Sequence, residues 1–239
     1  MKVASETWRR WAAAVGLLFA ACGPPFGFTP GHVFIIRGTS VFGSQTSPAV
    51  ISAYASSHRA LLGFDFLGIC VLALSLICFA ALLCRLSGPG SAGSILGLIG
   101  FGVSVLTATM VLVAVAAGVV IVELASPTDY PSISAAWLLI HGVGTIAPLP
   151  FSIFMLATGT VILTERSLPA WVGWLTLLVA GTVLGDGLNL FIQMTPLAAG
   201  WPFQPGGLPA TSAIWTFVLS LALVLERRRL PASQRKPAC

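Results

Sequence analysis

The stretch AGSILGLIGFGVSVLTATMVLVAVAAGVVIVEL, residues 92–124, decides the fold of this chain. It carries a single charged residue, Glu123, and it exceeds the roughly 20 apolar residues that a helix needs to cross a bilayer. Five further apolar runs are interpreted as spans in the same way: 11–28, 60–83, 133–163, 169–191 and 210–225. We therefore predict an all-α protein, a polytopic transmembrane helix bundle of six spans that forms one integral membrane domain over residues 1–239.

The composition supports a membrane environment. The 239 residues are 56% hydrophobic and only 8% charged, and the mean hydropathy is +0.96. A soluble domain usually carries about 25% charged residues. The net charge of +5 comes from basic residues at the chain ends and between apolar runs. Because they form no basic stripe interleaved with aromatic residues, we predict no nucleic-acid partner and take the lipid bilayer as the main one.

The basic residues also predict the orientation of the spans. With the N-terminus in the cytoplasm, ten of the twelve basic residues lie on the cytoplasmic side, and only Arg37 and Arg59 lie outside. Such a bias is typical of membrane proteins, so both termini are predicted to be cytoplasmic. The ten are Lys2, Arg9, Arg10, Arg85, Arg166, Arg227, Arg228, Arg229, Arg235 and Lys236.

The first run, 11–28, has two interpretations. The basic residues before it, together with the small residues that end at Cys22, resemble a signal peptide. Phe26-Gly27-Phe28 extends the run toward spanning length, which favours an uncleaved first helix. Cleavage would leave five spans and would not change the orientation of the others.

The fifth run carries the most specific polar pattern in the chain. Thr182, Asp186, Asn189 and Gln193 are spaced four, three and four residues apart, so they share one helix face. A polar stripe in a membrane span faces the bundle interior or water. A hydrogen-bonded strut between helices explains this stripe about as well as a binding site does.

Ionisable residues on four runs fall in one layer of the predicted bilayer. Asp65 lies about five residues inside the second run, roughly 7 Å at 1.5 Å per residue. His58 lies seven residues before it, on the same helix face. His141, Asp186 and Glu123 lie in the outer parts of the fourth, fifth and third runs. Because buried charges in lipid need a partner, water or a function, we predict that these residues and the stripe line a shared outward-facing pocket.

Two prolines and a capping pair predict local backbone features. Ser47-Pro48 is typical of an N-cap and first helical residue, so a helix is predicted to run from there through Tyr54 and His58 into the second span. Pro148 and Pro150 lie in mid-span and remove backbone donors. The helix is therefore either broken there, with carbonyls that line a cavity, or simply kinked.

Several chemistries are excluded or disfavoured. The only lysines are Lys2 and Lys236, so no span offers a Schiff-base lysine for retinal. Nucleotide-binding, zinc-protease and serine-hydrolase signatures do not occur. His141 with Asp65 and Asp186 could be imagined as a metal site, but local ligand spacing is missing. We therefore predict no metal and no cofactor.

Three motifs resemble one group of bacterial proteins. They are Y-x-x-x-H-R-x-x-L-x-x-D-x-x-G at 54–68, H-G-x-G at 141–144 and L-P-x-W-x-G-W at 168–174. The chain is similar over about residues 47–192 to bacterial six-helix membrane proteins grouped only as a domain of unknown function. The resemblance implies a bacterial inner-membrane protein and supplies no activity.

Three classes of function stay open. The first is binding or transport of a small solute, with proton coupling as one option, because buried carboxylates can shift their pKa. The second is a membrane assembly subunit without chemistry, and the third is an intramembrane enzyme that uses a buried carboxylic acid on a lipid or isoprenoid substrate. A small-molecule or lipid ligand is compatible with the first and third, and the oligomeric state is left open.

Overall fold

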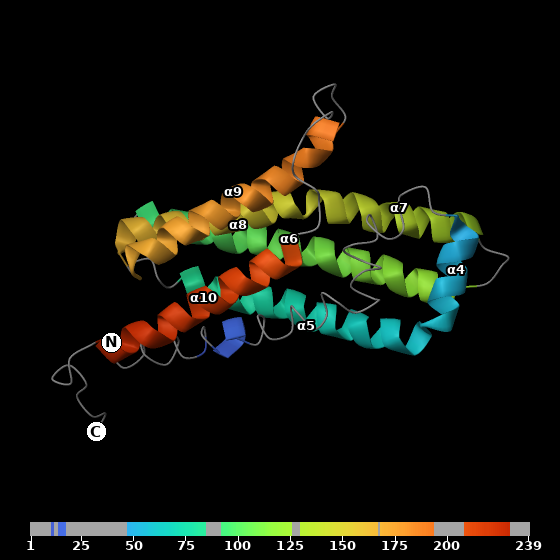
Figure 1. Cartoon of the computed structure of the whole chain (residues 1–239), viewed down its shortest axis with the longest axis horizontal. Coiled ribbons are helices and arrows are strands. Elements are labelled where there is room, and N and C mark those ends of the chain that lie inside the picture. Colours follow the sequence, from blue (N-terminus) through green and yellow to red (C-terminus); the bar gives the residue numbers. More distant parts are fainter. Residues whose placement is uncertain are drawn as a thin grey trace.

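The computed structural model of the chain describes residues 11, 14–17, 47–84, 92–125, 130–166, 168–193 and 208–229, and within them the side chains at 92, 145, 186, 189–193, 208–214 and 226–229 are left undescribed. All regular elements in this part of the chain are α-helices, which confirms the predicted all-helical class (Figure 1). Their bounds are α4 Pro48–Ser57, α5 Arg59–Leu83, α6 Ala92–Glu123, α7 Tyr130–Ile146, α8 Pro148–Glu165, α9 Ala170–Gln193 and α10 Leu208–Arg229.

Three stretches of helix are long and apolar enough to cross a membrane: Arg59–Leu83, Gly93–Glu123 and Tyr130–Glu165, the last of which joins α7 and α8. Shorter apolar helices run over Ala170–Gly185 and Trp215–Leu225. These lengths indicate a membrane protein. The helices coincide with the predicted second to sixth runs to within a few residues. Of the first run, residues 11 and 14–17 are helical, and a Cβ atom at Gly16 would collide with Phe79 and Ser220, so this fragment packs on α5 and α10.

The predicted continuous helix from Pro48 into the second span is wrong, because the chain turns at His58. Pro48 is the first residue of α4, as predicted, although Ser47 makes no side-chain cap hydrogen bond. His58 has φ −119° and ψ 19°, outside the helical region, and ends α4 before Arg59 starts α5. As a result α4 lies across the end of the bundle while α5, α6 and α7 run lengthwise (Figure 1).

The fourth run stays helical on both sides of its prolines. Ala147, between α7 and α8, keeps helical angles of φ −54° and ψ −31°. Its N–H donates to the Val143 carbonyl at 2.9 Å, and the Phe151 N–H reaches the Ala147 carbonyl at 3.4 Å. A proline costs one backbone hydrogen bond and a steric contact one turn earlier, which is enough for a bend. The backbone is not unwound into a cavity wall.

The helices bury two separate apolar cores. The first, here called the α4-end cluster, joins α4, α5, α6 and α7, and the second joins α5 and α8 to α10 at the opposite end. Each core buries one side of helices that are apolar all round, which leaves their other sides for lipid. The α4-end cluster comprises Ile51, Ala55, Leu62, Phe66, Ile69, Ala114, Val115, Ala117, Ile121, Val122, Ile133, Ala136, Trp137 and Ile140.

Glycines lie at the contact between α8 and α9. A Cβ atom added at Gly159 would lie 2.8 Å from Leu177 Cδ2 and 3.2 Å from the Gly173 carbonyl oxygen. Further along, one at Gly187 would lie 3.2 Å from the Leu149 backbone nitrogen. Small residues of this kind let helix backbones approach closely in lipid. The C-terminal end of α9 nevertheless turns away from α7 (Figure 1).

Candidate functional site

Asp65 is the most deeply buried ionisable residue in the part of the chain that the structure describes. It lies on α5 and has 0% of its surface exposed. Leu62 and Ile69, one turn before and after it, are also 0% exposed and belong to the α4-end cluster. α5 therefore turns the carboxyl group into the protein, as the membrane cost of an exposed carboxylate requires.

Tyr54 on α4 links Asp65 to His58. Its ring stacks on the His58 ring with centroids 4.4 Å apart and an interplanar angle of 21°. Burial raises the pKa of the Tyr54 hydroxyl, and the negative charge of Asp65 raises it further. The phenol therefore lies within electrostatic range of the carboxylate, whose charge disfavours a second negative charge on Tyr54. Of the predicted site residues, His58 contacts Tyr54 directly and Asp65 acts on it through its charge.

The His58 side chain is tied to the corner between α4 and α5. Its Nδ1 lies 2.8 Å from Ser57 Oγ and 3.1 Å from the Tyr54 carbonyl oxygen. The backbone N–H of His58 also donates to that carbonyl, at 3.1 Å. These contacts hold the end of α4 at an angle to α5.

His141 lies in the same end of the molecule, on α7. It is 9% exposed, and its ring packs edge-on against Trp137 with centroids 4.7 Å apart and an angle of 86°. Trp137 is 1% exposed and part of the α4-end cluster. Because the two residues are four apart on α7, the Trp137 indole lies next to the His141 imidazole on one helix face, and the indole packs in the core.

Asp65, Tyr54 and His141, here called the buried polar set, lie on three helices that share the α4-end cluster. A carboxyl, a phenol and an imidazole come from three helices, α5, α4 and α7, and α4 packs on both α6 and α7 above them. Carboxyl and imidazole groups exchange protons and bind cationic or hydrogen-bonding ligands. No group of three His, Cys, Asp or Glu side chains that could hold a metal occurs among the described residues.

Glu123 lies elsewhere. Its Oε2 accepts a hydrogen bond from Arg59 Nη2 at 2.7 Å, and both side chains are about 60% exposed. The pair joins the start of α5 to the end of α6 at the rim of an open groove of about 500 Å³. The groove is lined by Arg59, Ala60, Gly63, Phe66, Val119, Val122 and Glu123. The structure thus separates Glu123 from the buried polar set.

The polar stripe on α9 is only partly described. Thr182 is exposed, and its hydroxyl donates to the Val179 carbonyl at 2.7 Å, within its own helix. The side chains of Asp186, Asn189 and Gln193 lie outside the described residues. α9 packs mainly along α8, with smaller contacts to α10 and α7. That the stripe faces Asp65 and His141 stays a prediction.

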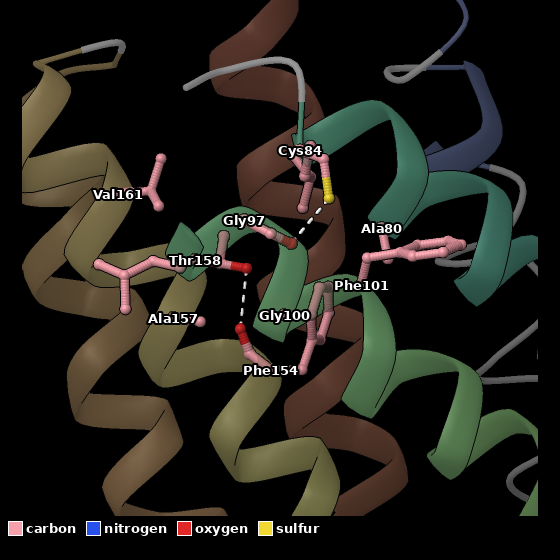
Figure 2. Close-up of a pocket in the computed structure, with 11 residues that line it drawn as sticks. Ala80, Cys84, Gly97, Gly100, Phe101, Phe154, Ala157, Thr158 and Val161 are labelled. Carbon is pink, nitrogen blue, oxygen red and sulfur yellow. Dashed lines mark hydrogen bonds between the residues drawn. The ribbon is translucent and has the colours of Figure 1, made fainter. Parts of the chain in front are cut away.

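A second, very small cavity lies between α5, α6 and α8 at the opposite end from α4. Its volume is about 10 Å³, the size of one water molecule. Figure 2 shows Cys84 pointing toward the Gly97 carbonyl, to which its Sγ donates at 2.8 Å, and the Thr158 hydroxyl donating to the Phe154 carbonyl at 2.9 Å. Neither this cavity nor the groove is lined by Asp65 or His141.

Comparison with protein-family models, curated proteins and solved structures finds no match to this chain. The assignment of a function must therefore begin from the buried polar set. Sequence analysis identified Asp65, His58 and His141 but not Tyr54, which it used only to delimit a helix and a motif. The signal was present, because Tyr54 and His58 are one helical turn apart in a segment that leads into a span.

Proposed function

We propose that the protein binds a small polar solute at Asp65 and moves it, with or without a coupled proton, across the bacterial plasma membrane. The observation that carries this proposal is the complete burial of Asp65 beside Tyr54 of α4. A carboxyl group inside a membrane helix is costly, at roughly 2.5–3.5 kcal/mol on insertion scales, and in such helices usually marks a ligand or proton path.

The arrangement of α4 supports a covered site. α4 is a separate helix, joined to α5 through the non-helical His58, and it covers the end of the bundle that holds Asp65 and His141. A short helix on one such joint can turn with only a few backbone angles changing. In this conformation Asp65 is enclosed, and a rotation of α4 would open it to the outside.

The topology belongs to the same proposal. Six spans with both termini in the cytoplasm place α4 and Asp65 at the outer face. Reporter fusions after residue 229 test this orientation. A fusion that is active outside the cell and silent in the cytoplasm would refute it.

Proton flux in liposomes tests the transport function. The purified chain is reconstituted with the pH-sensitive dye pyranine inside, and pools of amino acids, sugars and carboxylic acids are added outside. We expect one pool to drive a saturable pH change that Asp65→Asn abolishes. Glu123→Gln, at the surface ion pair, is the matched control and should retain the flux. Uptake of the same pools in radiolabelled form reports transport that moves no proton. The proposal is refuted if neither assay exceeds empty liposomes, or if the native chain and Asp65→Asn give equal signals in both.

A further inference from the structure

The groove between α5 and α6 combines an apolar floor with a charged rim. Phe66, Val119 and Val122 line it below, and Arg59 and Glu123 stand at its open end. Gly63 creates much of the space, because a Cβ atom built there would have no heavy atom within 4 Å. The groove lies between two helices that are long enough to cross a membrane, and its volume of about 500 Å³ is large enough for part of a lipid acyl chain.

The rim offers one positive and one negative group side by side. Arg59 begins α5 and Glu123 ends α6, so the pair sits at the level where lipid headgroups meet the protein. Beyond the Nη2–Oε2 contact of 2.7 Å, the guanidinium has further N–H donors and the carboxylate a second oxygen. An exposed pair contributes little to stability, so holding the fold together is a weak explanation for it.

We propose that this groove is a binding site for phosphatidylethanolamine. Arg59 binds the phosphate, Glu123 accepts hydrogen bonds from the primary ammonium, and an acyl chain lies over Gly63 toward Phe66. The match is one of charge. The headgroup carries a phosphate anion and an ammonium cation a few atoms apart, and the rim presents a cation, Arg59, and an anion, Glu123, to meet them. Phosphatidylglycerol lacks the cation and meets the negative Glu123. Phosphatidylcholine carries a quaternary ammonium that cannot donate a hydrogen bond. The site is separate from Asp65 and does not depend on the transport proposal.

Native mass spectrometry of the full chain tests the site. The protein is purified in detergent, stripped of lipid and mixed with equal amounts of phosphatidylethanolamine, phosphatidylglycerol and phosphatidylcholine that carry identical acyl chains. We expect phosphatidylethanolamine to be retained preferentially. Because an exposed charge pair changes affinity only modestly, Glu123→Gln should lower the preference over phosphatidylglycerol about three- to fivefold. Arg59→Gln should weaken the binding of all three lipids.

A pair of glycine variants distinguishes lipid bound in the groove from lipid bound nonspecifically elsewhere on the protein. At Gly63 an added Cβ atom meets no heavy atom within 4 Å, so Gly63→Leu should place a side chain in the groove and reduce lipid retention while the helix content is unchanged. Gly102→Leu on α6 is the matched control, since a Cβ atom there also meets nothing within 4 Å and the position does not line the groove. The proposal is wrong if Gly63→Leu retains as much phosphatidylethanolamine as Gly102→Leu, or if the native chain retains the three lipids equally.

Discussion

The indole N–H of Trp215 on α10 donates a hydrogen bond to the Thr176 hydroxyl on α9, at 2.9 Å, in the interior of the bundle. Trp215 is 2% exposed and Thr176 is 0% exposed. The same hydroxyl donates to the Val172 carbonyl at 2.8 Å. Thr176 Oγ1 therefore makes one hydrogen bond within α9 and one to α10. Phe79, Phe151 and Phe154 approach the indole edge-on, at centroid distances of 5.8 to 6.3 Å. This polar contact inside an aromatic cage therefore helps to anchor α10 on α9.

Thr176→Val should destabilise the protein by about 1–2 kcal/mol, because it leaves the buried Trp215 N–H without its acceptor. The free energy of unfolding in mixed detergent micelles measures this loss. Thr164→Val is the control, since the exposed Thr164 hydroxyl bonds only within its own helix. Equal stabilities of the two variants would show that the contact between α9 and α10 carries no net energy.

Gly159→Leu should destabilise the bundle by about 1–3 kcal/mol, as overpacking of a close helix contact does. The added side chain would meet Leu177 and the Gly173 carbonyl on α9. At Gly181, on α9 itself, an added Cβ atom meets nothing within 4 Å, so Gly181→Leu should be neutral or slightly stabilising, because leucine favours a helix over glycine. Thermal unfolding monitored by circular dichroism compares the two. A smaller loss at Gly159 than at Gly181 would contradict the packing described for α8 and α9.

The helices could be predicted from the sequence because hydrophobic length alone specifies a span. The run 92–124 became α6, Ala92–Glu123, almost residue for residue. The turns between helices were harder to predict. Ser47-Pro48 marks the start of α4, but nothing in the local composition distinguishes a turn at His58 from a continuous helix, because the turn depends on α4 packing against α6 and α7.

The candidate site was predicted in part for a similar reason. Polar residues in apolar runs identify Asp65 and His141 as buried, since lipid exposure is costly. Depth along a span, however, says nothing of direction around the helix axis. Glu123 shares the depth of Asp65 in the predicted topology, yet the structure places it in an exposed ion pair with Arg59. Partners across helices require the packed structure.

Arg166→Gly should stabilise the protein by about 1 kcal/mol. Arg166 closes α8 with φ 47° and ψ 34°, a left-handed conformation that costs a residue with a Cβ atom about this much and costs glycine almost nothing. Arg166→Ala is the control, because it removes the same side chain and charge and keeps the strain. Chemical unfolding in detergent measures both variants. If Ala and Gly stabilise equally, side-chain loss rather than backbone strain explains the effect.

Cys84 should react slowly with N-ethylmaleimide. Burial raises the pKa of its thiol, and less thiolate, the reactive form, is then present at neutral pH. In a chain in which every other cysteine is replaced by alanine, we expect labelling to accelerate with pH into the range above the ordinary thiol pKa. A Ser56→Cys variant that also lacks Cys84 is the exposed reference and should label several-fold faster at pH 7. Equal rates at both positions would contradict the burial of Cys84.

Tyr54 should ionise above its ordinary pKa of 10.0, and Asp65 should be part of the cause. The chain has two tyrosines, so absorbance at 295 nm in a Tyr130→Phe background reports Tyr54 alone. Adding Asp65→Asn removes the repelling charge and should lower the midpoint, though it stays above 10.0 because burial is the larger cause.

The same shift gives the pH dependence of stability a definite sign. Because the folded protein holds the Tyr54 proton more tightly than the unfolded chain, the associated stability is fully present below pH 10. It is lost as the pH rises through the folded pKa, and Tyr54→Phe should lack that loss. Glu123→Gln, at the surface pair with Arg59, should leave the 295 nm midpoint of Tyr54 unchanged. In the Tyr130→Phe background, a midpoint that Asp65→Asn does not move would show that Asp65 does not act on Tyr54, and a midpoint at 10.0 would also contradict the burial of Tyr54.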